Sequence, residues 1–335
     1  ARGVARTAKI ALRISGFQHR GQKLFSRFGV DIDEFTSGVA SFSGLLADPW
    51  VAIIGLHFHL DGSSIDQRVS AIQQILPLVD ALHQHGRPLE FIDLGGGIPV
   101  RYLQREDQWT HFQDEHERSL LGHRDAITFD RHGLGRIAGD GKVFGKLNSY
   151  PMYQDLVSAD WFSQLLNHKI AQSDAADCSV ASAIRSRGLQ LRCEPGRSLL
   201  DGCGMTIARV EFCKKHAGGY ALIGLSMNRT QCRTTDDEFL IDPILLSCAG
   251  DRGASQLQAI EGFLVGAYCT ESEFLSLRRF HFPRGVKRGD LIVFPNTAGY
   301  QMHFMESRSH QFPLAKNVFV DEHDPQHAHL DPIDR

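Results

Sequence analysis

The N-terminal part of the chain alternates between apolar patterns that are typical of strands and apolar patterns that are typical of helices. Strands are predicted at residues 8–14, 51–60, 89–97 and 189–193. Helices are predicted at residues 31–46, 64–86 and 153–170. Strand–helix units that repeat in this way pair their strands in parallel, which restricts the fold to a doubly wound sheet or a barrel.

From about residue 205 onward, strand patterns follow one another with turns between them and few helical patterns. These apolar segments begin near residues 205, 220, 238, 260 and 290. We therefore expect a second, mostly antiparallel β domain over residues 205–321, followed by a tail at 322–335.

Residues 104–150 interrupt the alternation of strands and helices. The segment is charged and rich in histidine in its first part and rich in glycine in its second part. A solvated insertion over the surface is predicted, because the histidines share no spacing that is typical of metal ligands. These histidines are His111, His116, His123 and His132.

Composition excludes several classes of function. The 335 residues carry a net charge of −3, and no basic stripe or cationic helix indicates binding to nucleic acid or to a membrane surface. The longest apolar run, near residues 51–58, is too short to span a bilayer. Seven cysteines without a Cys-x-x-Cys pair are typical of reduced thiols, so a cytoplasmic location is expected.

The predicted strand at 51–60 leads into three polar residues. His57, His59 and Asp61 are two positions apart, so their side chains face the same side of a strand. The rim at the carboxyl ends of barrel strands is a usual place for an active site. Three interpretations remain open: a hydrolase metal site, an imidazole above an aromatic cofactor, and core histidines bonded to the backbone.

Three glycines, Gly95, Gly96 and Gly97, follow directly on the next strand pattern. Successive glycines let a phosphate approach the backbone amides closely, although a tight structural turn explains them as well. The run is not a dinucleotide fingerprint, because the G-x-G-x-x-G spacing fails and Pro99 stands where the helix of that motif begins.

The strand at 189–193 ends in "CEPGR", where Glu194 and Arg197 flank a Pro-Gly turn. The two charges form either a surface ion pair or part of a binding site. In the second half of the chain, Cys269 ends a strand pattern beside acidic residues. It is a candidate nucleophile or proton donor, or alternatively a small buried apolar residue. Tyr300 follows an Ala-Gly turn from which its hydroxyl can point at an anion.

The order of these stretches carries more information than any one of them. The series "SRFGVD", "GLHFHLDG", "DLGGG", "CEPGR", "GAYCTESE", "GDLIVF" and "AGY" resembles the fold-type III pyridoxal-phosphate decarboxylases that act on ornithine, diaminopimelate and arginine. The resemblance implies a (β/α)8 TIM-type barrel, a β domain, and a homodimer with shared active sites. Residues 1–204 are then expected to form only about strands 5–8 of the barrel.

The resemblance also implies roles for single residues toward pyridoxal 5′-phosphate. His59 is expected to stack on the pyridine ring, and Glu194 to hydrogen-bond the ring nitrogen and keep it protonated. The residues expected at the phosphate are Gly95, Gly96, Gly97, Gly196, Arg197 and Tyr300.

Further roles concern the amino-acid substrate. Cys269 is expected to reach into the partner's active site and return a proton to the substrate carbon, and Glu271 or Glu273 to lie near the distal end of the substrate. Arg229 and Arg233 are candidates for bidentate binding of a substrate carboxylate.

The chain departs from the family pattern at three points. In this family, a lysine in a Lys-x-Asn motif on an early barrel strand forms the Schiff base with the cofactor, and none of the nine lysines here has that context. We therefore expect the chain to lack the N-terminal part of the barrel and to be inactive alone. Asp61 precedes Gly62-Ser63 where the family has Gly-Ser directly, and Arg233 is followed by Asp237 where a tyrosine is usual.

Two rival functions are kept. One is a non-catalytic remnant that binds a phosphate ligand through the glycine run and Arg197. The other is a metal-dependent hydrolase that uses His57, His59 and Asp61, whereas the decarboxylase interpretation expects no bound metal. The hydrolase interpretation leaves the "GGG" and "EPGR" stretches without a role.

Overall fold

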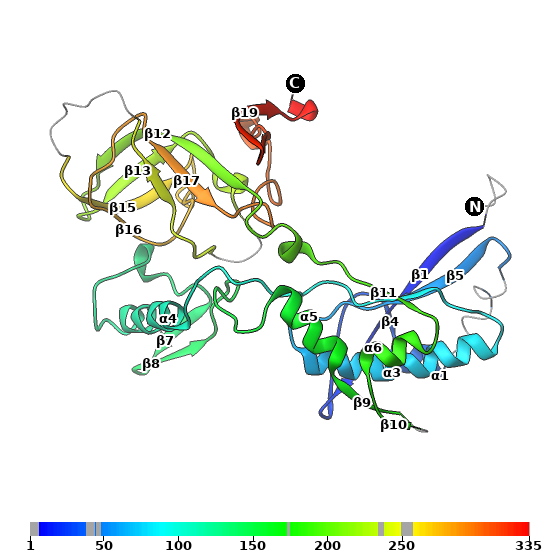
Figure 1. Ribbon diagram of the computed structural model, residues 1–335. Coiled ribbons are helices and arrows are strands. Elements are labelled where there is room, and N and C mark those ends of the chain that lie inside the picture. The colour runs from blue at the N-terminus through cyan, green and yellow to red at the C-terminus, as the bar shows by residue number, and fades with distance from the viewer. Residues whose placement is uncertain are drawn as a thin grey trace. The chain divides into compact units, whose positions relative to one another are not determined.

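The protein is described here by a computed structural model, which covers residues 7–37, 44, 48–172, 175–233, 238–248 and 257–334 (Figure 1). The chain divides into two compact units. Unit 1 comprises Ala1–Val100 and Asp155–Leu199, and unit 2 comprises Arg101–Gln154 and Leu200–Arg335. In the described ranges, no helix has both the length and the apolar content that are needed to cross a bilayer.

Unit 1 is built on a parallel sheet with the strand order β11-β6-β5-β1-β4. Every neighbouring pair in it is parallel, as the repeated strand–helix pattern predicts. The strands are β1 (Ala8–Ser15), β4 (Val30–Asp31), β5 (Val51–His57), β6 (Phe91–Asp93) and β11 (Gln190–Arg192). Because the strands are parallel, their carboxyl ends meet at one edge of the sheet.

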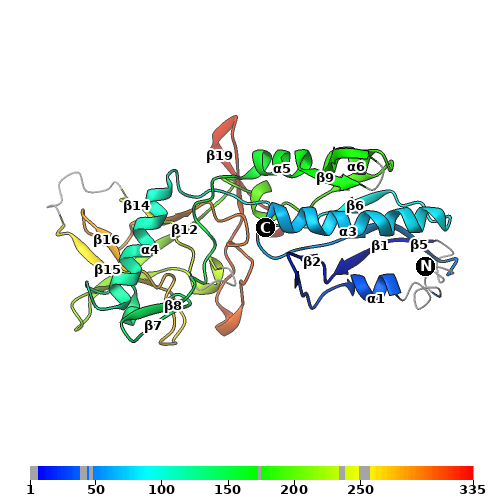
Figure 2. The ribbon, with the colours of Figure 1, turned by 90° about the horizontal axis from the view of Figure 1, so that it is seen from below.

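Helix α3 (Ile65–Gln84) covers this sheet and confirms the predicted helix at 64–86. Ser64 caps its first turn by accepting a hydrogen bond from the Gln67 amide. The predicted apolar stripe is buried, and each such side chain contributes about 1.5–3 kcal/mol to folding. Its members are Val69, Ile72, Ile75, Leu76, Val79 and Leu82. Helices α5 (Ser158–Asn167) and α6 (Val180–Arg185) pack against α3 and against each other (Figure 2).

Several predicted boundaries in unit 1 are corrected. The strand predicted at 51–60 ends at His57, and the one predicted at 89–97 ends at Asp93, because the backbone beyond each leaves the ladder at the sheet edge. Helix α1 spans Ile32–Ser37, and much of the remainder of the predicted helix at 31–46 lies outside the described residues. Two hairpins were not predicted: β2 (Gln18–His19) with β3 (Gln22–Lys23), and β9 (Lys169–Gln172) with β10 (Ala175–Ser179).

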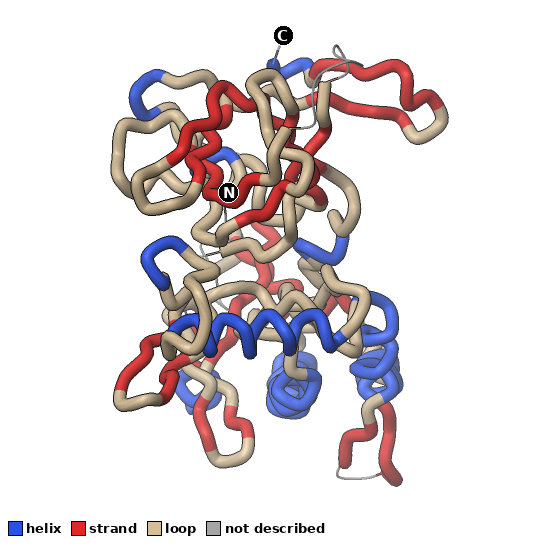
Figure 3. Tube along the Cα trace, turned by 90° about the vertical axis from the view of Figure 1, so that its left-hand side faces the viewer, coloured by secondary structure: helices blue, strands red, loops and turns tan. Residues whose placement is uncertain are grey.

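Unit 2 contains a six-stranded sheet with the order β14-β17-β12-β13-β15-β16, whose strands are red in Figure 3. All neighbouring pairs are antiparallel except β13 with β15, so the expected mostly antiparallel β domain is confirmed. The strands are β12 (Met205–Lys215), β13 (Ala221–Leu225), β14 (Ile244–Leu246), β15 (Ile260–Val265), β16 (Phe280–Phe282) and β17 (Leu291–Pro295).

Residues 101–154 belong to unit 2, which differs from the predicted domain boundary at 204 and from the predicted solvated insertion. They form helix α4 (Glu106–Leu120) and a hairpin of β7 (Arg136–Gly139) and β8 (Lys142–Gly145). The physical reason is a small apolar core shared with residues 239–277, in which Leu134, Met152 and Leu240 are buried. Of the four histidines, His116 is fully buried and stacks on Phe112.

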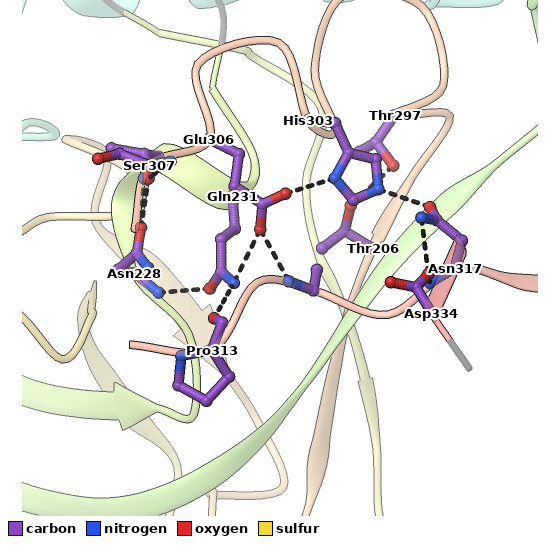
Figure 4. Close-up of polar contacts among 12 residues, drawn as sticks. Thr206, Asn228, Gln231, Thr297, His303, Glu306, Ser307, Pro313, Asn317 and Asp334 are labelled. Carbon is purple, nitrogen blue, oxygen red and sulfur yellow. Dashed lines mark hydrogen bonds and ion pairs between the residues drawn. The ribbon is translucent and has the colours of Figure 1, made fainter. Parts of the chain in front are cut away.

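The C-terminal segment forms the hairpin β18 (Val318–Asp321) with β19 (Asp324–Leu330), which spans the predicted boundary between β domain and tail. A polar network holds this segment within unit 2 (Figure 4). His303 contacts Glu306 through Nδ1 at 2.5 Å and Asn317 through Nε2 at 2.6 Å, and the Asn317 amide donates to Asp334 at 2.7 Å. We call these four residues the C-terminal clasp.

Candidate functional site

The carboxyl-end edge of the unit 1 sheet gathers the polar residues of three strands. His57 ends β5, Asp93 ends β6, and the two are register partners; Asp93 is also the partner of Arg192 at the end of β11. Backbone hydrogen bonds continue past the strand ends, from Phe58 N–H to Asp93 O and from Glu194 N–H to Gly95 O, both at 2.9 Å. These bonds bring the loops after the three strands together at one place.

Two histidines face one carboxylate at this edge. Glu194 Oε2 lies 3.5 Å from His57 Nε2 and 3.9 Å from His59 Nδ1. The Glu194 side chain is 57% exposed and that of His59 43%, whereas His57 is nearly covered at 16%. Glu194 and His59 can therefore both meet a ligand from outside, and His57 lies behind them.

The surroundings of His59 favour the neutral form of its imidazole. Its Nδ1 accepts a hydrogen bond from the Gly96 amide at 3.1 Å, so the proton of the neutral ring is on Nε2. Burial lowers the pKa of His59, and the positive charge of Arg13 lowers it further against the opposing effect of Glu194. A neutral ring held by the backbone is suited to stacking on another ring.

The glycine run is a tight turn in which side chains have no space. Gly95 and Gly97 have φ of +64° and +82°, a region that favours glycine. An added Cβ would lie 2.5 Å from Phe58 O at Gly95 and 2.1 Å from Arg68 Nη2 at Gly97. The structural-turn interpretation is therefore correct for these positions, and it leaves the ligand-binding interpretation open.

The amides of the turn are used unequally. Gly95 N–H donates to Asp93 Oδ1 at 2.9 Å, and Gly96 N–H donates to His59. Gly97 is exposed, and its N–H has no acceptor among the described residues. Of the three predicted phosphate donors, the amide of Gly97 is thus the one that an incoming anion can take without breaking an internal bond.

Behind the turn lies a buried cation that the sequence interpretation missed. Arg68 is 0% exposed, and its Nη2 donates to Gly62 O and to Gly96 O, each at 2.8 Å. Its guanidinium carbon lies 5.1 Å from the Trp161 ring centroid. The available signal was its place on α3, three residues after Ile65 and four before Ile72, where the apolar stripe predicts an apolar residue.

The other predicted residues of unit 1 are Gly196 and Arg197, which follow Glu194 closely in the sequence, and Asp61, which lies after β5. Gly196 has φ of +55° and begins a short 3₁₀ turn (Gly196–Leu199), in which Arg197 is half-buried. Asp61 is exposed and accepts a hydrogen bond from the amide of Gly62 at 2.9 Å.

The predicted metal set of His57, His59 and Asp61 is not the one that the fold assembles in the described part of the chain. Because β5 ends at His57, the three residues do not share one strand face. Instead His57, Asp93 and Glu194 each offer one ligand atom, and these atoms lie within 4.8 Å of one another. Sequence reasoning missed Asp93, whose signal was its position as the last residue of a strand.

The remaining predicted residues lie in unit 2, around the loop after β15. Cys269 and Glu271 are exposed, whereas Glu273 is 4% exposed. Glu273 Oε1 accepts from the Arg229 amide at 2.8 Å, and burial raises the pKa of this carboxyl despite the nearby Arg229 charge. Glu273 is therefore an acceptor for the Arg229 amide through Oε1, and its side chain is buried.

A cavity of about 440 Å³ in unit 2 brings three of the predicted substrate residues together. Its lining includes Arg229, Arg233, Glu238 and Glu271. Glu238 is buried, burial raises the pKa of its carboxyl, and its Oε2 accepts from the Leu277 amide at 2.7 Å. The cavity thus offers two guanidinium groups and an exposed carboxylate to a small polar ligand.

Tyr300 is also in unit 2, in the loop after β17. It has φ of +65° and is 45% exposed, and its ring meets that of Phe304 edge-on at 5.2 Å.

A family model matches the N-terminal part of the chain. Residues 2–128, which include His59 and the glycine turn, match the family described as "Pyridoxal-dependent decarboxylase, pyridoxal binding domain". Over this region the chain is similar to the pyridoxal-dependent decarboxylases of fold type III. The resemblance read from the ordered motifs is therefore confirmed.

Similar proteins extend the match beyond this region. An uncharacterized protein, y4yA, of Sinorhizobium fredii is 30% identical over 299 residues, which cover 89% of this chain and 59% of that protein. The diaminopimelate decarboxylase of Neisseria meningitidis is 24% identical over 331 residues, covering 95% of this chain and 62% of that enzyme. The chain thus spans about three fifths of the length of these relatives.

Solved structures of family members share the fold. Diaminopimelate decarboxylase from Helicobacter pylori, complexed with L-lysine, has a TM-score of 0.60 at 16% identity and covers 98% of this chain and 65% of that one. The arginine decarboxylase of Paramecium bursaria Chlorella virus, bound to agmatine, has a TM-score of 0.55 at 15% identity. The match covers 91% of this chain and 63% of that enzyme.

Proposed function

We propose that this chain binds pyridoxal 5′-phosphate and serves the removal of the α-carboxylate from an amino acid. The proposed substrate class is that of diaminopimelate, ornithine and arginine. The observation that carries the proposal is one sheet edge on which the neutral ring of His59, the outward Gly97 amide and the exposed Glu194 carboxylate lie together.

The residues present fit this cofactor. An added Cβ at any of the three glycines would collide with the protein, so the turn requires glycine, and the exposed Gly97 leaves its amide N–H available to a phosphate. Glu194 is exposed and can accept a hydrogen bond from a protonated pyridine nitrogen, and His59 can stack on the ring. Gly95, Gly96, Gly196, Arg197 and Tyr300 are proposed to complete the phosphate site. When bound, pyridoxal phosphate supplies an electron-accepting ring that stabilises the negative charge left by a departing carboxylate.

Substrate recognition is proposed for the cavity of unit 2. Arg229 and Arg233 supply guanidinium groups that match a carboxylate, and Glu271 supplies a partner for a distal amine or guanidine. Cys269 carries an exposed thiol, and we propose that it returns a proton to the substrate carbon across a homodimer interface. Glu271 is favoured over Glu273 for the substrate role, because Glu273 is buried and its Oε1 accepts from the Arg229 amide.

The lysines of unit 1 are poor nucleophiles where their contacts are described. Lys9 is ion-paired with Glu90 at 3.1 Å, and Lys23 is bound by both Asp31 and Asp33. The hydrogen bonds to these aspartates raise the pKa of Lys23, which keeps its ammonium protonated. We therefore propose that this chain by itself forms no covalent bond to the cofactor and is inactive alone.

The test of the function uses the protein purified from its natural source. Release of CO₂ from diaminopimelate, ornithine or arginine is measured with and without added pyridoxal phosphate. We expect release that depends on the cofactor, and a loss of at least about a hundredfold in the Glu194→Gln protein, because that variant cannot hold the ring nitrogen protonated. Cofactor binding without turnover of any amino acid would instead favour the non-catalytic phosphate-binding protein.

A metal-dependent hydrolase is the second candidate, and the ligand atoms of His57, Asp93 and Glu194 are the observation that favours it. The two proposed functions assign different ligands to Glu194: the pyridine nitrogen in the decarboxylase and a metal ion in the hydrolase. Elemental analysis of the purified protein separates them: the decarboxylase proposal expects no stoichiometric zinc or manganese, and one equivalent of either metal, lost in the Asp93→Ala protein, would favour the hydrolase.

A further inference from the structure

Among the described residues, Arg68 has no counter-charge. All its nitrogen contacts are with backbone carbonyls, no carboxylate in the described chain pairs with it, and its Nε has no hydrogen-bond partner. Burial lowers the pKa of Arg68 to about 10, so the group is still cationic at neutral pH. A buried cation without an anion is costly to keep, and a structural role is served equally well by neutral groups.

The contacts of Arg68 determine the direction of one peptide group. Its Nη2 binds Gly96 O at 2.8 Å, so the carbonyl of the Gly96–Gly97 peptide points toward the buried guanidinium. The peptide is trans, so its N–H points the opposite way. That N–H belongs to Gly97, an exposed residue whose N–H has no acceptor among the described residues.

The same guanidinium joins two loops behind the cradle. It binds Gly62 O and Ser64 O in the loop after β5, and Gly96 O in the loop after β6. Trp161 covers it on one side and donates from Nε1 to Ser63 O at 2.8 Å. The arrangement therefore keeps a positive charge one peptide group behind an outward-pointing N–H donor.

We propose that Arg68 is a positioning residue for the phosphate of the cofactor: from behind the glycine turn it orients the Gly96–Gly97 peptide and supplies the positive charge that balances the bound dianion. The inference rests on the proposed function. A charged donor on the carbonyl side polarises the peptide and strengthens its N–H as a donor, and the low dielectric of the interior preserves the attraction between guanidinium and phosphate.

The main experiment compares two probes that differ only in the phosphate. Pyridoxal 5′-phosphate and pyridoxal are titrated into the full chain by equilibrium dialysis, and the ratio of the two dissociation constants measures the preference for phosphate. We expect the wild-type chain to prefer pyridoxal phosphate, and Arg68→Met to reduce this preference at least about tenfold. Arg68→Lys keeps the positive charge but not the several N–H donors of the guanidinium. Its ratio of dissociation constants is therefore expected to lie between those of the wild type and of Arg68→Met.

Arg187→Met is the matched control. Arg187, two residues after the end of α6, makes two hydrogen bonds of 2.7 and 2.8 Å to the Asp80 carboxylate on α3. Its replacement therefore also removes a largely buried arginine from unit 1. Asp80 lies about 18 Å further along α3 than Arg68 at 1.5 Å per residue. A merely structural role of Arg68 changes the binding of both probes alike and leaves the ratio equal to that of this control.

A second measurement needs no variant. In the wild-type chain labelled with ¹⁵N-glycine, addition of inorganic phosphate is expected to move the Gly97 amide resonance, and to move those of Gly95 and Gly96 less because their protons are already bonded. A larger response at Gly95 or Gly96, or an unchanged phosphate preference in Arg68→Met, overturns the role of Arg68 and leaves the proposed function standing. A wild-type chain without preference for pyridoxal phosphate overturns both.

Discussion

At the scale of single residues, the site depends on a position where no side chain fits. A Cβ at Gly97 would lie 2.1 Å from Arg68 Nη2 and 2.5 Å from Gly62 O, and the backbone there has φ of +82°. Gly86, at the end of α3, has a similar φ of +72° but nothing within 4 Å of its Cβ position. Comparing alanine substitutions at Gly97 and Gly86 therefore separates the cost of backbone strain from the cost of crowding against the Arg68 guanidinium.

We predict that Gly97→Ala destabilises unit 1 by about 2–4 kcal/mol, the sum of left-handed strain and overpacking. Gly86→Ala carries the strain alone, so we expect a loss of about 1–2 kcal/mol. Urea unfolding followed by the fluorescence of Trp161, which is buried in unit 1, measures both losses. Equal losses in the two variants would contradict the close contact between Gly97 and Arg68.

The residues that sequence reasoning found and missed differ in what makes them visible. Gly95–Gly97 and Glu194 can be recognised from a short stretch of sequence, because a run of glycines or a charge at a strand end is uncommon. Arg68 stands out only as a charge at an apolar position of α3, and Asp93 only as the last residue of a strand, and their importance arises when the loops after β5 and β6 meet. The face shared by His57, His59 and Asp61 was predicted wrongly, because a pattern of alternation does not show where the ladder of hydrogen bonds stops.

At the scale of elements, the C-terminal clasp makes the hairpin of β18 and β19 sensitive to pH. Burial by itself lowers the pKa of His303, but hydrogen bonds to Glu306 and Asn317 outweigh it and raise the pKa above 6.5. For Glu306, burial is outweighed by hydrogen bonds from the Ala315 amide and from His303, which lower the pKa below 4.5. Asp334 faces the same cluster, and the Asn317 amide lowers its pKa.

The directions of the His303 and Glu306 pKa shifts define the pH range in which the clasp is strongest. A raised folded pKa means that His303 stabilises the clasp fully below pH 6.5 and loses this contribution as the pH rises through the folded value. A lowered folded pKa means that Glu306 stabilises it above pH 4.5 and loses this contribution as the pH falls through the folded value. The clasp is therefore strongest between these two pH values.

We predict that hydrogen-exchange protection of the β18–β19 amides, corrected for the intrinsic rate, decreases as the pH rises above 6.5. His303→Gln should flatten this dependence, because glutamine does not titrate. His327→Gln is the matched control: His327 is on β19 and pairs with Asp324 on the exposed side, outside the clasp. Protection that is equally pH-dependent in the His303→Gln chain would contradict the clasp.

At the scale of the whole molecule, the two units have separate cores. The sequence predicted the change from parallel to mostly antiparallel strands, because each half has its own periodicity. It did not predict that residues 101–154 form a small core with residues 239–277, because the apolar side chains of α4 and of residues 129–152 are sparse and are separated by more than eighty residues from those partners. The many charged residues of that segment made the narrow apolar face of α4 hard to recognise in the sequence.

A pair of buried leucines tests this division. Leu134 in unit 2 and Leu165 in unit 1 are both 0% exposed, and each truncation to alanine costs about 2–5 kcal/mol. We predict that Leu134→Ala lowers hydrogen-exchange protection in β12 and β17 and leaves α3 unchanged, whereas Leu165→Ala does the reverse. Loss of protection in α3 on Leu134→Ala would place residues 101–154 with unit 1 instead.

The central claim is that Glu194, at the edge of the unit 1 sheet, receives the protonated ring nitrogen of pyridoxal phosphate. The most direct measurement is the ¹⁵N chemical shift of ring-labelled pyridoxal phosphate bound to this chain at neutral pH. We predict the shift of a protonated pyridine in the wild-type chain and that of an unprotonated pyridine in Glu194→Gln. An unprotonated ring in the wild-type complex, or the same protonated ring in both proteins, would contradict the claim.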